Sequence, residues 1–346
     1  MLFEKAIIEE MRYVKLIFLL LGIALLAWVL GQADLEEIWS QVRSISVLGI
    51  LSIFVVYALY FGADVVSWQH TLESVDMTAR WAGRLFLVRM IGEAYNNITP
   101  AASMGGEPVK AWLLKTNYGI ALRDSGASLI LAKTTSMFSL IIFAGAAVSI
   151  ALAHEQLSEA HKSMVGIGFA WLFFNVAVFF LIQHLRLSSL TASGLGKTRF
   201  GLRLSRLVTG MQDMDEQFAR FYRHDRRRLI LSMTYAMANW LLGVVELYVI
   251  LDLIGYPVSW SDAFVIEAAV QTIRTIAFFI PAGIGAQEGM LMFACGVIVG
   301  SPNVGIAAAL LRRFRELVWI AASLLLAAAF HANPKLAAQT SPPAEG

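Results

Sequence analysis

Long apolar blocks alternate with short polar connections along nearly the whole chain. Each block is about twenty residues long, which is the length that an α-helix needs to cross the hydrocarbon core of a bilayer. Polar positions inside the blocks are few, and this is typical of membrane-spanning helices rather than of helices on the surface of a soluble protein. The pattern predicts six full spans, at residues 14–32, 45–69, 126–153, 163–183, 229–253 and 306–330.

Two further apolar segments, 85–118 and 262–300, each contain a break. In both, a Pro-Ala pair is followed by glycines, and a glutamate stands seven residues after the proline: Glu107 follows Pro100, and Glu288 follows Pro281. Proline removes a helical hydrogen bond and glycine relaxes the backbone, so the helix should break there. Such a break is tolerated at membrane depth where the freed backbone is buried in protein or faces a watery cavity. Two breaks in corresponding places of two halves indicate the binding site of a transporter.

The distribution of positive charge predicts how the chain is oriented. Segment 184–228 holds ten Lys or Arg residues and four acidic residues, and the N-terminal segment carries Lys5, Arg12 and Lys15. By the positive-inside rule, both segments are cytoplasmic. The number of crossings between them must then be even, which requires that segment 85–118 enters the bilayer and returns to the same side.

We therefore predict an all-α polytopic membrane protein with an inverted-topology repeat, two re-entrant helical hairpins and cytoplasmic termini. The first repeat covers residues 1–153, residues 154–162 form a short external linker, and the second repeat covers residues 163–330 and includes the cytoplasmic loop 184–228. The tail, 331–346, is expected to be disordered. Charge parity does not distinguish a hairpin from two full crossings. The half-segments, about 14 to 19 residues long, favour the hairpin.

Composition narrows the class of function. The chain is 58% hydrophobic and 15% charged, which excludes a soluble globular domain. Its single cysteine, Cys295, excludes a disulfide framework and a metal site built from several cysteines. Gly196-Lys197-Thr198 resembles the end of a P-loop, but position 191 is Thr rather than Gly and no strand precedes it. We expect no catalytic residues, no cofactor, no metal and no nucleic-acid partner.

Ionisable side chains inside apolar segments are the candidates for function, because each costs about 2.5 to 3.5 kcal/mol at the bilayer centre. Glu107 and Glu288 should lie near the N-terminal end of a returning helix, where unpaired N–H groups and the helix dipole favour negative charge. They either cap these helices or help the glycine N–H groups to bind an anionic headgroup, and both can be true. The expected substrate-binding residues are Asn97, Thr99, Gly105, Gly106, Glu107, Lys110, Arg274, Gly283, Gly285, Gln287, Glu288 and Arg313. The expected ion-coupling residues are Glu107, Glu288, Asp64 and Glu246.

Several cations near these segments leave two interpretations open. Lys110 follows Glu107 by three residues and either pairs with it or contacts a phosphate. Arg274, Arg312, Arg313 and Arg315 are too many to lie deep in the bilayer without a role, but Arg312 and Arg313 could equally extend towards an interface. Lys133 is expected to lie shallow, near the cytoplasmic side.

The motifs resemble one known family. Asn-x-Thr-Pro followed by Gly-Gly-Glu-Pro-Val-Lys-Ala-Trp-Leu-Leu-Lys at 97–115, then Lys133-Thr134-Thr135, then Pro-Ala-Gly-Ile-Gly-Ala-Gln-Glu at 281–288, resembles the lysylphosphatidylglycerol synthase transmembrane-region family. The Gly-Gly-Glu-Pro segment is most similar to its hopanoid-biosynthesis-associated branch. The resemblance implies a flippase-like, lipid-translocating fold with Glu107 and Glu288 at its cavity. It implies no synthase activity, because the longest hydrophilic segment leaves no room for an aminoacyl-transferase domain.

The sequence therefore predicts an integral protein of the bacterial cytoplasmic (inner) membrane that moves a polar-headed lipid between leaflets. Phospholipids, aminoacyl-phospholipids, isoprenoid lipids and hopanoids are all candidate substrates. One alternative is a membrane enzyme or an assembly partner of lipid-biosynthesis enzymes, which would act without moving lipid. Another is a transporter of small solutes or ions. The oligomeric state is left open.

Overall fold

The computed structural model describes residues 20–332 except 21–22, 30, 32–33, 99–105, 154–157, 185–224, 278–279 and 281–282. The described residues form helices and connecting turns, and they contain no strand. The helices are α2 Leu35–Arg43, α3 Val47–Thr71, α4 Ala79–Ile98, α5 Gly106–Tyr118, α6 Leu122–Ala153, α7 Glu159–His184, α10 Arg226–Leu253, α11 Trp260–Ile276, α12 Ala286–Ile298 and α13 Pro302–Ala332. The predicted all-α class is confirmed.

Four of the predicted spans correspond to helices that are long and apolar enough to cross a membrane, namely α3, α6, α7 and α10. The predicted span at 306–330 lies within α13, which carries Arg312, Arg313, Arg315 and Glu316 near its centre. The predicted span at 14–32 lies mostly outside the described residues, as does the tail after residue 332. The total number of crossings, the inverted repeat and the side of the termini stay predictions.

Both predicted breaks separate two helices that pack against each other. Helix α4 ends at Ile98 and packs on α5, and α11 ends at Ile276 and packs on α12. Pro100 and Pro281 lie outside the described residues. The returning helices α5 and α12 have 13 residues each. They are therefore about 20 Å long, shorter than the roughly 30 Å of a hydrocarbon core, which favours the re-entrant arrangement over two full crossings.

Glycines allow the helices to approach closely at these breaks. A Cβ on Gly106, the first residue of α5, would lie 2.1 Å from the carbonyl oxygen of Gly92 on α4. In the second break, Gly283 and Gly285 have φ values of 61° and 82°, which residues with a Cβ rarely adopt. Glycine is thus required for close packing in the first hairpin and for the turn in the second.

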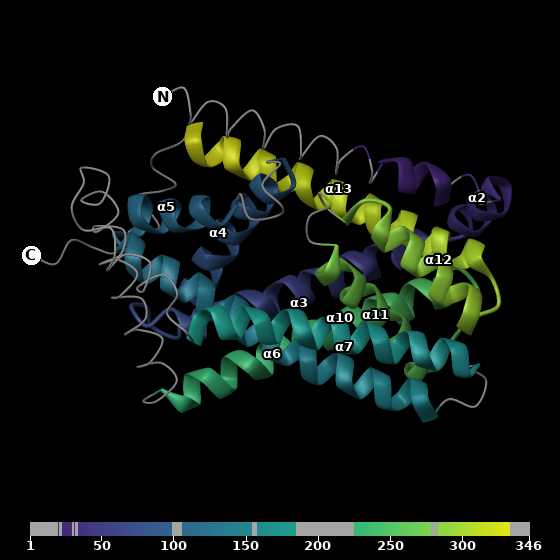
Figure 1. The fold of residues 1–346 in the computed structure, drawn as a ribbon. Helices are drawn as coiled ribbons and strands as arrows, with labels where there is room; N and C mark the ends of the chain where they lie inside the picture. The colour runs from purple at the N-terminus through teal and green to yellow at the C-terminus, as the bar shows by residue number, and fades with distance from the viewer. Residues whose placement is uncertain are drawn as a thin grey trace, which may run out of the picture.

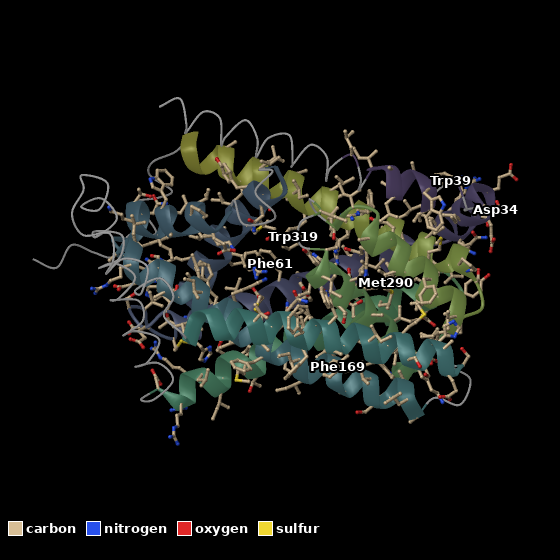
Figure 2. All side chains as sticks on the ribbon, in the orientation of Figure 1. Asp34, Trp39, Phe61, Phe169, Met290 and Trp319 are labelled. Carbon is tan, nitrogen blue, oxygen red and sulfur yellow. The ribbon has the colours of Figure 1, made fainter. Side chains whose placement is uncertain are left out.

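Helix α13 runs along one side of the molecule and α6 and α7 along the other, with α3 and α11 between them, while α10 runs from the lower left edge to the middle (Figure 1). Helix α3 packs along α10, and α12 packs along α13. Aromatic side chains join α3 to α13, where the rings of Phe61 and Trp319 lie 5.2 Å apart between centroids (Figure 2). This packing brings the charged centre of α13 against the interior of the bundle.

Large apolar side chains also cover the outer surface. Leu48, Ile167 and Leu325 are each at least 70% exposed, and they belong to α3, α7 and α13. Exposed apolar surface on several sides of a helical bundle is what a lipid-facing protein needs, and it would be an aggregation hazard on a soluble one. The fold is thus that of an integral membrane protein.

The short helix α2 is fixed to the start of α13. Asp34 caps α2 by accepting hydrogen bonds from the backbone N–H groups of Glu36 and Glu37, both at 3.1 Å. Asn303 of α13 accepts a hydrogen bond from the Asp34 N–H at 3.2 Å and donates one to the Glu37 carboxylate. Trp39 of α2 is 65% exposed at the end of the bundle (Figure 2).

Candidate functional site

Glu288 lies in the first turn of α12 and is held by two partners. Its Oε2 accepts a hydrogen bond from the backbone N–H of Gly285 at 2.7 Å, and its Oε1 accepts one from Arg313 Nε of α13. The residue is only 2% exposed. The carboxylate therefore caps its helix and neutralises a cation from the neighbouring helix, and it already accepts the Gly285 N–H that the sequence suggested for an anionic headgroup.

Glu107 occupies the corresponding position in α5 but is much more accessible. Its side chain is 38% exposed and forms an ion pair of 2.8 Å with Lys110 Nζ one turn later. The Gly106 N–H donates a hydrogen bond to Asn96 Oδ1 at 2.7 Å, so this group is also satisfied within the protein. The two glutamates have different environments: Glu288 is locked in the protein, whereas Glu107 faces accessible space.

The arginines of α13 lie inside the bundle, at the middle of a 31-residue helix. Arg312 and Arg315 are 3% and 4% exposed, so the predicted alternative that Arg312 extends to an interface is wrong. Arg312 Nη2 donates to Glu267 Oε2 of α11 at 2.6 Å and to the carbonyl oxygen of Gly243 at 3.3 Å. Arg315 pairs with Glu246 of α10, and its guanidinium lies 3.7 Å from the centre of the Tyr57 ring.

These groups form a continuous buried ion-pair network. Glu246 Oε2 also lies 3.7 Å from Arg312 Nε, and Glu316 accepts from Arg313 Nη1 at 2.8 Å. Burying a charge is costly unless it is paired, so each arginine requires a carboxylate from a neighbouring helix. The network ties α10, α11, α12 and α13 together. Glu246 and Arg313, which the sequence indicated for coupling and binding, are parts of it.

Asp64, the other predicted coupling residue, pairs with Arg89 across the contact between α3 and α4. The Arg89 guanidinium also lies 4.3 Å from the centre of the Phe61 ring. Asp64 and Glu246 are therefore alike in that each neutralises an arginine on a helix packed beside its own.

A second group of charges gathers around Lys133 on α6. Glu107, Lys110, Arg274 and Glu93 all act electrostatically on its ammonium group. We call these five residues the inner cluster. They come from α4, α5, α6 and α11, so both hairpins contribute, and their formal charges are three positive and two negative. Lys133 and Arg274 are exposed, and neither forms a hydrogen bond or an ion pair within the described part of the chain.

The remaining predicted binding residues are placed less fully. Thr99 and Gly105 lie outside the described residues, and so does the side chain of Asn97 at the end of α4. Gly283 lies in the turn before α12. A Cβ on this residue would lie 3.9 Å from the Cγ of Arg274. Gln287 is 2% exposed, and its Oε1 has no hydrogen-bond partner among the described residues. Arg274 and Gly283 thus meet, as the hairpin arrangement requires.

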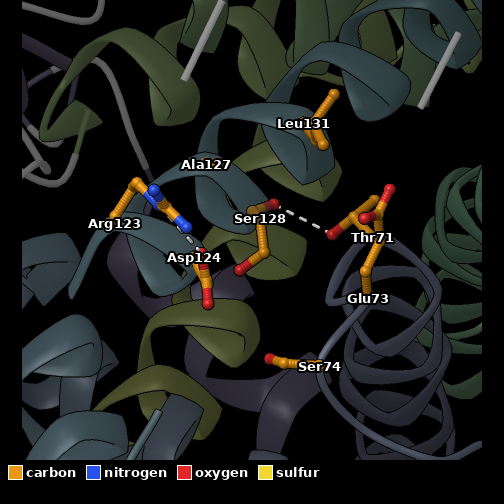
Figure 3. A pocket seen from close by; sticks show the side chains of 8 residues that line it. All are labelled: Thr71, Glu73, Ser74, Arg123, Asp124, Ala127, Ser128 and Leu131. Atoms are coloured by element: carbon orange, nitrogen blue, oxygen red, sulfur yellow. Dashed lines mark hydrogen bonds and ion pairs between the residues drawn. The ribbon is translucent and has the colours of Figure 1, made fainter. Parts of the chain in front are cut away.

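A separate pocket of about 270 Å³ lies between the end of α3 and the start of α6 (Figure 3). Its walls include Thr71, Glu73, Arg123 and Ser128, and the Thr71 hydroxyl donates to the Ser128 carbonyl oxygen at 2.9 Å. None of the predicted site residues lines it. We place the candidate site at the inner cluster instead, because there accessible charge lies beside both predicted breaks and on α6, a helix apolar enough to span a membrane.

Sequence reasoning undervalued two residues. Lys133 was left out of the predicted binding residues, although Glu107 of the first hairpin and Arg274 of the second both act electrostatically on it; its shallow depth stays a prediction. Glu267 was not singled out, although it is a carboxylate inside the apolar run of α11 and is 1% exposed. The available signal was the same in both cases: an ionisable residue within an apolar helix requires a partner or a cavity.

Comparison with known proteins gives one consistent result. The model of the lysylphosphatidylglycerol synthase TM region family matches residues 15–328. The chain is 23% identical over 337 residues to a UPF0104 membrane protein of Methanothermobacter thermautotrophicus, covering 92% of this chain and 95% of that protein. It is 22% identical over 297 residues to a UPF0104 membrane protein of Pyrococcus horikoshii, covering 82% and 88%. No solved structure matches the chain.

Proposed function

Because the chain belongs to the lysylphosphatidylglycerol synthase TM region family, and has a membrane lipid-related role on that ground, we propose that it is a lipid transporter. It moves a polar-headed lipid between the leaflets of the cell's cytoplasmic membrane. The headgroup passes along the inner cluster between the two hairpins, while the acyl chains stay in hydrocarbon. The protein itself performs no covalent chemistry on the lipid.

One observation carries this proposal: accessible charged side chains gather in the interior of an apolar bundle. Glu107 is 38% exposed and Lys133 and Arg274 are exposed, and they lie on α5, α6 and α11. An ionisable group at membrane depth that is not fully paired usually marks the route of a polar substrate. The helices that carry Glu107 and Arg274 adjoin the two breaks, which is where transporters place their binding sites.

The buried ion-pair network supports the same function by holding the second hairpin. Arg313 and Arg312 of α13 bind Glu288 of α12 and Glu267 of α11. A hairpin fixed in this way presents Arg274 at a defined position. In the first hairpin, the ion pairs of Arg89 with Asp64 and of Lys110 with Glu107 are more exposed, so a difference in rigidity between the hairpins is part of the proposal.

The test uses purified protein in phosphatidylcholine vesicles that contain a lipid labelled on its acyl chain with a fluorophore. Dithionite bleaches the label in the outer leaflet, and loss of the protected inner-leaflet signal measures movement between leaflets. We expect Glu107→Gln to abolish movement with the protein still folded, because the carboxylate is accessible and not part of the core. Glu288→Gln should abolish movement as well and also reduce stability, because Arg313 loses its charged partner.

Two results would contradict the proposal. Unchanged lipid movement in both variants would remove Glu107 and Glu288 from the site. Flux of a trapped small solute or ion without lipid movement in the wild type would favour a solute transporter. Replacement of the exposed Lys115 by Gln is the control, because this residue lies in the last turn of α5 outside the inner cluster.

A further inference from the structure

Five cations well inside the described helices each have a carboxylate partner. Arg89 pairs with Asp64, Lys110 with Glu107, Arg312 with Glu267, Arg313 with Glu288, and Arg315 with Glu246. Lys133 and Arg274 do not follow this rule, since neither forms an ion pair or a hydrogen bond within the described ranges. A cation at membrane depth is costly, so two that are left unpaired require an explanation.

Lys133 lies far from either end of its helix. It is the twelfth residue of the 32-residue α6, which places it about 16 Å from the start of the helix axis. The two residues that follow it, Thr134 and Thr135, are fully buried, whereas Lys133 is exposed. The Thr134 hydroxyl is buried without a hydrogen-bond partner among the described residues. The exposure of Lys133 shows that accessible space meets its face of α6.

Packing of α6 against α11 explains why Lys133 and Arg274 are neighbours. The rings of Phe143 on α6 and Phe264 on α11 lie 4.5 Å apart between centroids. Lys133 precedes Phe143 by ten residues, and Arg274 follows Phe264 by ten, so each is about 15 Å from this contact along its helix. The electrostatic effect of Arg274 on Lys133 fits an antiparallel packing of the two helices with both cations on the same side of the contact.

The carboxylates nearby do not neutralise this pair. Glu93 and Glu107 act on Lys133, and Glu316 acts on Arg274, but neither cation forms an ion pair within the described residues. Glu107 already forms an ion pair with Lys110, and Glu316 forms ion pairs with Arg313 and Arg315. Two like charges that face accessible space and repel each other are stabilised by a shared anion.

We propose that Lys133 and Arg274 together bind the phosphate oxyanion of the lipid headgroup. This inference rests on the proposed function and narrows its substrate to phosphate-bearing lipids. A phosphodiester offers two charged oxygens, which suit the planar fork of a guanidinium and the compact charge of an ammonium group approaching from different helices. Glu107, on the opposite hairpin, then faces the part of the headgroup that lies beyond the phosphate.

The experiment compares two acyl-chain-labelled probes in phosphatidylcholine vesicles: phosphatidylglycerol, and a glucosyl diacylglycerol that has no phosphate. We expect Lys133→Gln and Arg274→Gln each to slow phosphatidylglycerol movement by about tenfold or more, the usual effect of losing a hydrogen bond to a charged group. Lys133→Arg and Arg274→Lys should keep most of the rate, because they retain the charge. Lys115→Gln should match the wild type.

A second readout does not depend on transport. Phosphatidylglycerol retained by the purified protein, measured by mass spectrometry per folded molecule, should fall in both Gln variants and be kept in Lys133→Arg. Both cations are exposed, so their replacement removes no ion pair or hydrogen bond within the described residues. Protection of the buried Cys295 from a thiol reagent confirms that each variant is folded.

The arms of the experiment separate the ways in which the inference can fail. Unchanged phosphatidylglycerol movement and retention in both Gln variants would overturn the phosphate site while leaving lipid transport intact. Equal slowing of the glucosyl probe would show a general structural effect and would also overturn it. Uptake of radioactive inorganic phosphate that depends on Lys133 would assign the site to free phosphate instead. A wild type that moves neither probe would refute the proposed function itself.

Discussion

Removal of Arg312 from the ion-pair network is the sharpest test of what holds the second hairpin in place. Arg312 is 3% exposed and its Nη2 lies 2.6 Å from the Oε2 of Glu267, which is 1% exposed. The substitution Arg312→Met keeps the apolar stem and removes the charge, so Glu267 is left ionised in the protein interior. Breaking a buried ion pair from one side costs about 3 to 5 kcal/mol. We expect the Tm to fall by on the order of 10 °C.

The single cysteine of the chain provides the assay. Cys295 is buried in α12, which packs on α13. A dye that fluoresces on reaction with a thiol therefore reports the separation of these helices on heating in detergent. Lys162→Met is the matched control: Lys162 pairs with Glu159 at 3.1 Å, but the Glu159 side chain is 90% exposed. Such surface pairs contribute about 0 to 1 kcal/mol, so its Tm should hardly change.

A double variant separates loss of a charge partner from loss of packing. Arg312→Met with Glu267→Gln no longer leaves the charge of Glu267 without a partner, so it should melt above Arg312→Met alone. The reasoning fails if Arg312→Met melts like Lys162→Met, or if the double variant is less stable than the single one. Either result would mean that the contact between Arg312 and Glu267 does not hold α11 against α13.

Two further predictions concern packing. Gly106→Ala places a Cβ 2.1 Å from the Gly92 carbonyl oxygen, so α4 and α5 must separate; we expect a loss of about 1 to 3 kcal/mol, measured as a lower Tm. Gly166→Ala, where a Cβ would have no neighbour within 4 Å, is its control, and equal Tm values for the two would refute the close approach. Asn303→Ala removes the contacts that fix α2 to α13, so hydrogen exchange in α2 should rise by a factor of about five to ten. Unchanged exchange would show that α2 is held by other contacts.

Local sequence predicted the elements well where a local cause was sufficient. The apolar blocks at 45–69, 126–153, 163–183 and 229–253 match α3, α6, α7 and α10, because the length of an apolar run directly reflects the bilayer thickness. The two broken segments match pairs of packed helices. In the second, the glycines that follow Pro281 adopt positive φ values, which few other residues adopt.

The site was predicted less completely. The sequence shows that an ionisable residue lies in an apolar segment, where its charge costs free energy, but it does not show which residue neutralises that charge. Glu107 and Glu288 looked equivalent, since both follow a proline by seven residues. In the structure they differ. Glu288 is buried and pairs with Arg313 of α13, whereas Glu107 pairs with Lys110 of its own helix. Whether each glutamate is buried or accessible therefore depends on the helix that packs beside it.

The amino-acid sequence by itself determined that this chain lies in a membrane, where its helices break, and which ionisable residues need an explanation, because these properties depend on runs of neighbouring residues. Only the tertiary structure decided which charges neutralise each other. Arg312 and Glu267 are 45 positions apart and Arg315 and Glu246 are 69 apart. Their pairing, and the absence of a partner for Lys133 and Arg274 in the described part of the chain, follow from how the helices pack.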